Sequence, residues 1–175
     1  MKKNKTVKVF LLIAAIAVAF CGCSPNDMQS LYPSETDYSK TLDINTPEGL
    51  AQTSAKLYQS LINGDIDTEQ GFQKLYEISS AESKKALDER KGEFIEQLAM
   101  VQESYKENPI TEYRYSKTEL ADENNASICR IQINKSGDKY YFKQDYVKEN
   151  GTWKIKGDNA ATEFRIKDQF LFWYF

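Results

Sequence analysis

The stretch that most constrains this fold runs from residue 126 to residue 155, where apolar and polar side chains alternate in two runs that lead into a hairpin signal. Such alternation is typical of β-strands, because successive side chains of a strand point to opposite faces of a sheet. Asn150-Gly151 separates the second run from a short segment around Trp153. An Asn-Gly pair suits a two-residue turn in which both central residues have positive φ. The pattern predicts antiparallel strands joined by short turns.

Four strands are expected in this half of the chain. Their ranges are Glu112–Leu120, Ala126–Ile133, Lys139–Val147 and Thr152–Ile155. Alternation places Cys129, Ile131 and Ile133 on one face of the second strand, with Arg130 and Gln132 on the other. In the third strand it places Tyr140, Phe142 and Tyr146 on one side, opposite Tyr141 and Val147.

Three helices are expected before the strands. Thr46-Pro47 is a good helix start, with a capping hydroxyl and a proline at the first helical position, and Asn63-Gly64 suits a helix end. A second, shorter helix is expected from Asp67 or Thr68 to Ile78. The third is expected to run to about Lys106, after a capping box between Ser79 and Glu82 and with a bend or break at Gly92. Helices followed by antiparallel strands predict an α+β fold, in which the helices pack on one face of a curved sheet of about four strands.

Three short motifs carry a resemblance. They are Asn63-Gly64-Asp65 after the first helix, the Asn125-Ala126-Ser127 turn, and Asn150-Gly151-Thr152-Trp153-Lys154-Ile155. In this order and spacing, residues 46–157 resemble the nuclear transport factor 2-like superfamily (cystatin-like, SnoaL-like), and in particular small bacterial lipoproteins with this cone-shaped fold. The resemblance implies a concave sheet that binds a ligand or a protein segment. The residues expected to line it, as core first and ligand contacts second, are Tyr113, Tyr115, Ile131, Ile133, Tyr140, Phe142 and Trp153.

The N-terminus predicts delivery to a membrane. A head rich in lysine precedes the apolar run Val9–Phe20, which falls short of the roughly 18–20 residues that a spanning helix needs. Gly22-Cys23 follows, and a small residue directly before a cysteine resembles the lipobox of bacterial lipoproteins, although Phe20 replaces the usual leucine. The resemblance implies that Cys23 carries a diacylglycerol group and becomes the first mature residue, on the outer side of the cytoplasmic membrane or in the outer membrane. An uncleaved anchor or a plain secretory signal is the alternative.

These observations divide the chain into four parts. The expected parts are a signal peptide at 1–22, a flexible tether at 23–45, the α+β domain at 46–157 and an aromatic extension at 158–175. The extension ends in Phe170–Phe175, a run of large apolar residues that is costly to expose to water. This run is expected to form a further strand, to cover the open sheet, or to bind a partner.

The amino-acid composition argues against several classes of function. The chain has no histidine, which is the commonest general base and metal ligand, and it has no paired metal-ligand spacing, so no metal and no cofactor is expected. Its formal net charge of −3 gives no electrostatic reason to bind nucleic acid. Cys129 lies in an apolar strand and is expected to be a buried free thiol.

Three functions stay open from the sequence. The first is a non-enzymatic lipoprotein that binds a small ligand or a protein segment. The second is an isomerase or dehydratase, which the family resemblance implies; with no histidine, its base would be a carboxylate such as Asp145 or Asp65. The third is an assembly or immunity role through Phe170–Phe175. No phosphate-binding loop, nucleophile elbow or paired-carboxylate motif favours the second.

Overall fold

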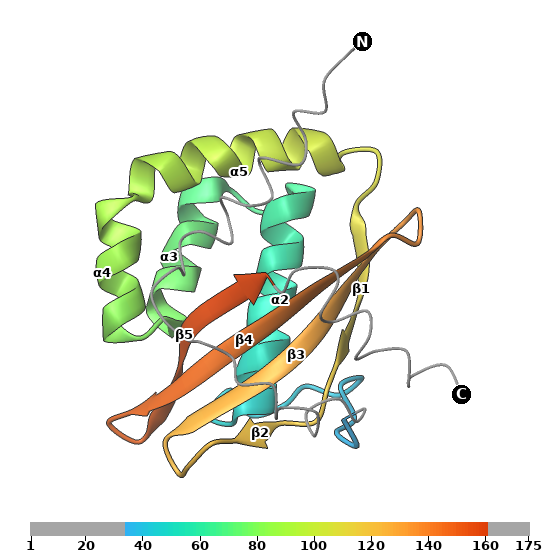
Figure 1. Cartoon of the computed structure of the whole chain (residues 1–175). Helices are drawn as coiled ribbons and strands as arrows, with labels where there is room; N and C mark the ends of the chain where they lie inside the picture. Colours follow the sequence, from blue (N-terminus) through green and yellow to red (C-terminus); the bar gives the residue numbers. More distant parts are fainter. Residues whose placement is uncertain (1–33, 161–175) are drawn as a thin grey trace.

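The computed structural model of this chain describes residues 34–160, which form helices α2–α5 followed by an open antiparallel sheet (Figure 1). The α+β class expected from the sequence is confirmed over these residues. The predicted signal peptide, the first part of the predicted tether and the aromatic run Phe170–Phe175 lie outside the described residues.

Local capping chemistry sets the ends of the first two helices. Helix α2 spans Pro47–Asn63, and the Thr46 hydroxyl accepts a backbone N–H of its first turn at 3.1 Å. It ends at Gly64, whose φ of 77° is left-handed and favours glycine. Helix α3 spans Thr68–Ile78, and the Asp67 carboxylate accepts two N–H groups of its first turn. Both predicted helices are confirmed.

The predicted third helix is divided in two. Helix α4 spans Ala81–Glu89 and helix α5 spans Lys91–Tyr105, and Arg90 between them has φ −123° and ψ 16°, which is not helical. The predicted break is confirmed, two residues before Gly92. Helix α5 packs on α2, α3 and α4, so the helices form one connected layer.

The strands form one sheet in the order β1-β3-β4-β5. The short strand β2 pairs with β3 along the same edge as β1 but at the opposite end of β3. Their bounds are β1 Ile110–Tyr115, β2 Glu119–Leu120, β3 Asn125–Asn134, β4 Lys139–Glu149 and β5 Thr152–Ala160. Asn150 and Gly151 have φ of 50° and 80°, which confirms the predicted two-residue turn between β4 and β5. The single strand predicted at Glu112–Leu120 is wrong in its middle, since residues 116–118 separate β1 from β2.

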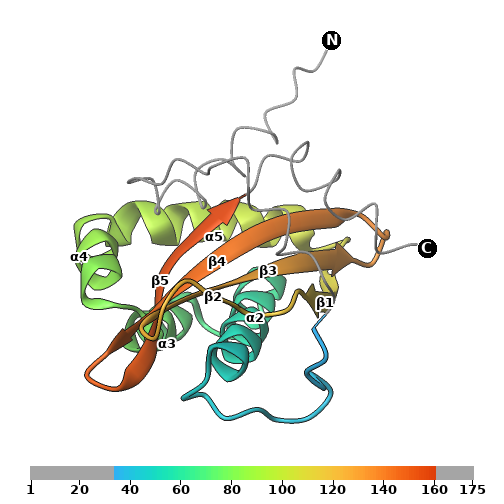
Figure 2. The same cartoon turned by 60° about the horizontal axis from the view of Figure 1, so that its bottom comes forward.

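The apolar core lies between the sheet and the helices. In Figure 1, α2 passes behind the strands, and in Figure 2, α2 and α3 lie below them. The buried residues of this core are Leu50, Ala51, Ala55, Leu57, Leu61, Phe72, Leu75, Leu87, Phe94, Leu98, Tyr115, Ala126, Ile128, Tyr146, Trp153 and Ile155. Because Ala126 and Ile128 belong to it, the even-numbered side chains of β3 face the helices. Ile131 and Ile133 therefore lie on the opposite, outer face.

A contact between the helical layer and β5 decides where α4 begins. The Ser80 N–H donates to the Ile155 carbonyl at 2.8 Å, and Ser79 forms a parallel bridge with Ile155. The Ser80 hydroxyl accepts the Ser83 N–H at 3.2 Å, so Ser80 caps the helix. The predicted capping box between Ser79 and Glu82 is wrong, because Ser79 is held by the sheet one residue outside the cap.

The segment before α2 also lies against the domain. The Tyr38 ring stacks on the Tyr115 ring, with centroids 3.9 Å apart. The Gln52 side chain donates to the carbonyls of Tyr38 and Lys40 at 2.8 and 2.6 Å and accepts the Leu42 N–H at 3.1 Å. From Ser34 onward, the last part of the predicted tether thus has fixed contacts with α2 and β1.

Candidate functional site

The helix-facing side of the sheet carries a group of buried polar side chains, which we call the Arg130 cluster: Arg130, Gln132, Asn134 and Gln144. Their exposed fractions are 4% for Arg130, 2% for Gln132, 3% for Asn134 and 1% for Gln144. The register pairs Arg130 with Phe142 on β4 and with Tyr115 on β1, so these side chains share the face that packs on the helices. A sheet face that packs on helices is ordinarily apolar, because burying polar groups costs free energy. The cluster is therefore the most unusual feature of this interior.

Arg130 is enclosed by aromatic rings. Its guanidinium carbon lies 4.8 Å from the centroid of the Tyr58 ring, 5.2 Å from that of Phe142 and 5.6 Å from that of Tyr113. These rings come from α2, β4 and β1, so three separate elements surround one charge. Aromatic faces attract a cation within about 6 Å. Arginine keeps its charge in proteins, so this position is cationic at all ordinary pH values.

Neutral donors and acceptors continue the cluster toward α5. The Gln132 amide donates to the Tyr105 hydroxyl at 3.1 Å and to the Asn134 side-chain oxygen at 3.4 Å. The Tyr113 hydroxyl donates to the Gln132 side-chain oxygen at 3.4 Å. Burial raises the pKa of Tyr105 well above its ordinary value, so its hydroxyl stays protonated at neutral pH. This end of the cluster is polar and uncharged.

Among the described residues, only one of the two polar side-chain atoms of Gln144 forms hydrogen bonds. Its Oε1 accepts the Ser54 hydroxyl at 2.8 Å and the Tyr146 hydroxyl at 2.5 Å. Its Nε2 is buried and has no hydrogen-bond acceptor among the residues that the structure describes. A buried amide donor without an acceptor costs roughly 1–3 kcal/mol. The cluster therefore holds a donor that a bound acceptor group would satisfy.

The predicted lining residues are divided between the two faces. Tyr113 and Phe142 contact Arg130, and Tyr140 lies beside Gln132 by register. Tyr115 and Trp153 also face the helices, but they belong to the apolar core. Ile131 and Ile133 cannot line the same site, because they lie on the outer face. The prediction of one lining made of all seven residues is corrected accordingly.

The candidate site residues named from the sequence did not include Arg130, Gln132 or Gln144. A usable signal was present in the strand pattern: Ala126 and Ile128 share the parity of Arg130. Their apolar side chains could have identified the even-numbered face as the one that packs on the helices. The isoleucines at 131 and 133 hid this signal because they made the other face look like the core.

Neither carboxylate that the sequence offered as a base lies in the cluster. Asp145 pairs with Ser127 across β3 and β4, and its odd position places it on the outer face of the sheet. Asp65 is exposed in the turn between α2 and α3. The contacts described here give the cluster a fixed cation and hydrogen-bond donors, which suit binding an anionic or polar group better than removing a proton.

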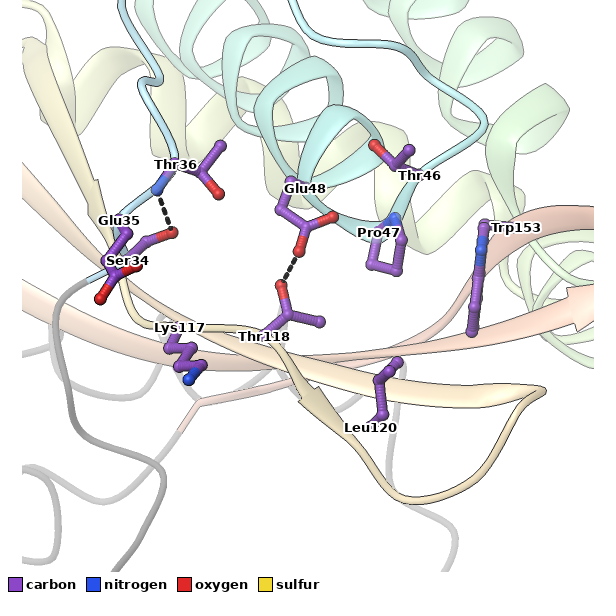
Figure 3. Close-up of a pocket in the computed structure, with 10 residues that line it drawn as sticks. All are labelled: Ser34, Glu35, Thr36, Thr46, Pro47, Glu48, Lys117, Thr118, Leu120 and Trp153. Carbon is purple, nitrogen blue, oxygen red and sulfur yellow. Dashed lines mark hydrogen bonds between the residues drawn. The ribbon is translucent and has the colours of Figure 1, made fainter.

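A hollow lies at the N-terminus of α2, away from the Arg130 cluster (Figure 3). It has a volume of about 470 Å³, and its lining residues are Ser34, Glu35, Thr36, Thr46, Pro47, Glu48, Lys117, Thr118, Leu120 and Trp153. The Thr118 hydroxyl donates to the Glu48 carboxylate across it, and the Thr36 N–H donates to the Ser34 hydroxyl at 3.1 Å. Four of its polar lining residues thus hydrogen-bond one another in pairs, and of the predicted lining residues it contains only Trp153. We regard it as a surface groove of the fold.

Two further observations complete the description. Among residues 34–160, no helix combines the length and the apolar character needed to cross a bilayer. Comparisons with protein-family models, with curated protein sequences and with solved structures find no match to this chain. What can be inferred about function therefore comes from the sequence motifs and from the geometry of the Arg130 cluster.

Proposed function

We propose that this chain is a lipid-anchored envelope protein that binds a small anionic ligand, without catalysis, on the helix-facing side of its sheet. We also propose that residues 46–157 form a domain of the nuclear transport factor 2-like type. The order of helices before a single antiparallel sheet supports the second proposal. Gly22-Cys23 after an apolar run supports the anchor.

The observation that carries ligand binding is the position of Arg130. Arg130 lies in the interior with an exposed fraction of 4%, and three aromatic rings surround its guanidinium. Its planar donors match a carboxylate, and the rings of Tyr58, Tyr113 and Phe142 offer apolar surface to the body of a ligand. Tyr113, Tyr140 and Phe142 are only half-buried, so the cluster reaches the surface on that side. These features favour a carboxylate attached to an aromatic body.

Thermal unfolding in the presence of matched probes tests this binding. We expect benzoate and phenylacetate to raise the melting temperature with increasing concentration, because a ligand that binds only the folded state stabilises it. Benzamide, which has the same ring but no charge, is expected to have little effect. The shift should disappear in Arg130→Met and persist in Arg114→Met, an exposed arginine of β1 paired with Glu112 at 2.6 Å.

Two outcomes would refute ligand binding at Arg130. One is an equal rise of the melting temperature with benzamide and benzoate, which would show that the ligand's negative charge does not contribute to binding. The other is a shift that survives in Arg130→Met, provided that this variant is folded by circular dichroism. Arg130→Lys separates charge from shape, since lysine keeps the charge but loses the planar fork of donors.

Acylation is tested by metabolic labelling with an alkyne fatty acid. We expect label on the wild-type chain and on Cys21→Ser, and no label on Cys23→Ser. Label that survives in Cys23→Ser would refute the anchor, and label lost in Cys21→Ser would move it to the other cysteine. This experiment is independent of ligand binding.

A further inference from the structure

The outer face of the sheet carries an apolar strip on β3, formed by Cys129, Ile131 and Ile133. Alternation and register place these side chains away from the helices, between Glu112 and Arg114 on β1 and Lys139, Tyr141 and Lys143 on β4. The strip is nevertheless buried, with exposed fractions of 6%, 6% and 8%. None of the three residues belongs to either of the two apolar clusters that the described residues form between helices and sheet.

Within residues 34–160, no helix covers this strip. Helix α2 packs on β1, β3 and β5, helix α4 contacts the β5 edge, and helix α5 reaches Gln132 on the helix-facing side of the sheet through Tyr105. Figures 1 and 2 show α2 and α3 on one side of the strands. The segment before α2 stacks through Tyr38 on Tyr115, which faces the helices. The strip therefore needs an additional cover.

The position of the strip limits what can cover it. The last described pair of β5 is Ala160 with Phe142, and Phe142 is also the partner of Arg130, so the last described residue of β5 lies at the level of the strip. β5 is separated from β3 only by β4, a distance of about 10 Å at the usual strand spacing. The fifteen residues after Ala160 can span at most about 50 Å. The C-terminal residues thus have ample length to reach the strip.

The chemistry of the C-terminus matches the strip. Phe170–Phe175 consists entirely of large apolar side chains, and such a run is costly to expose to water. We propose that Phe170–Phe175 of the same chain docks on the outer face of the sheet and covers Cys129, Ile131 and Ile133. A tethered segment has an effective concentration in the millimolar range, which favours it over a second copy of the chain.

Cys129 reports on this cover. In a full chain carrying Cys21→Ser and Cys23→Ser it is the sole thiol. Burial raises its pKa to about 11, which is consistent with a shielded thiol. The measurement is the rate of modification by a thiol reagent in the folded protein. Replacing Phe170–Phe175 by serines, or ending the chain after Gln169, is expected to raise this rate by about tenfold or more, because a local cover is removed.

A cysteine on the other face is the matched control. Ala126 is 4% exposed and belongs to the helix-facing core, so Ala126→Cys combined with Cys21→Ser, Cys23→Ser and Cys129→Ser places the sole thiol there. Its modification rate should not change when the C-terminus is altered. An unchanged rate at Cys129 would overturn the proposal, as would an equal rise at both positions, which would indicate general unfolding.

A second measurement needs no truncation. With Cys129 in place, we expect at least one of Leu171→Cys, Phe172→Cys and Trp173→Cys to form an intrachain disulfide on mild oxidation. A cysteine in the exposed turn before β3, Glu123→Cys, should not. Absence of every intrachain disulfide would overturn the proposal. So would protection of Cys129 that is lost on dilution, since that would assign the cover to a second copy.

Discussion

Two glycines in helices of this chain are expected to respond oppositely to the same substitution. Alanine is favoured over glycine by about 1 kcal/mol inside a helix, so Gly→Ala in a helix ordinarily stabilises. At Gly49, in the first turn of α2, an added Cβ would lie 1.9 Å from the Asp43 carbonyl oxygen and 2.9 Å from the Ile44 nitrogen. Both are backbone atoms, so the 43–44 segment has to move. At Gly92 in α5, no atom of residues 34–160 lies within 4 Å of an added Cβ, apart from Gly92 itself, its chain neighbours and the nearby backbone of its own helix.

The loss of stability expected for Gly49→Ala follows from the hydrogen bonds that the displaced Asp43 carbonyl accepts. The Asp43 oxygen accepts the Thr46 N–H at 3.0 Å and the Thr46 hydroxyl at 2.7 Å, which fix the start of α2. Each such hydrogen bond contributes about 0.5–1.5 kcal/mol, and forcing extra volume into packed structure costs about 1–3 kcal/mol. After the helix preference is subtracted, Gly49→Ala should lower the free energy of unfolding by about 1–5 kcal/mol. Gly92→Ala should raise it by about 0.5–1 kcal/mol.

Thermal and urea unfolding, followed by circular dichroism at 222 nm, measure both variants against the parent chain. At about 3 °C per kcal/mol for a chain of this size, Gly49→Ala should melt about 3–15 °C lower and Gly92→Ala about 1–3 °C higher. A Gly49→Ala variant as stable as Gly92→Ala would refute the reasoning. It would mean that the contact with the 43–44 backbone places no constraint on α2.

Three further substitutions test other parts of the fold. Trp153→Ala removes a core side chain that is 8% exposed and should cost about 3–5 kcal/mol in urea unfolding; a loss below about 1 kcal/mol would show that Trp153 is not packed in the core. Gly151→Ala places a side chain at φ 80° and should cost about 1 kcal/mol, whereas Asn150→Gly should be nearly neutral; equal effects would contradict the turn geometry. Ser54→Ala removes a hydroxyl that donates to Gln144 at 2.8 Å and should lower the free energy of unfolding by about 1–2 kcal/mol. An unchanged free energy of unfolding would show that this hydrogen bond does not stabilise the fold.

Features encoded by neighbouring residues were predictable from this sequence. Thr46-Pro47 and Asn63-Gly64 mark the ends of α2, and Asn150-Gly151 marks the last turn, because each signal acts within a few residues. The alternating runs likewise identified β3 and β4 as strands. These predictions were enough to give the α+β class.

Features set by contacts between distant segments were not predictable. Ser79 and Ser80 are equivalent as local caps, and the choice between them depends on Ile155, far along the chain. The prediction of which face of β3 packs on the helices failed for a related reason. Both faces of this strand are buried, so apolar character alone does not identify the face that contacts the helices. The Arg130 cluster was missed as a consequence.

The attachment of α4 to the sheet also affects how this domain opens. Leu87 is the only residue of α4 that is buried, and a helix this short does not persist in isolation. Its first N–H, that of Ala81, donates to the Glu149 carboxylate at the tip of β4, and the Ser83 hydroxyl donates to the Lys156 carbonyl at 2.7 Å. The amide hydrogens of α4 should therefore exchange with solvent together with those of β5, as one cooperative unit that crosses the boundary between helices and sheet.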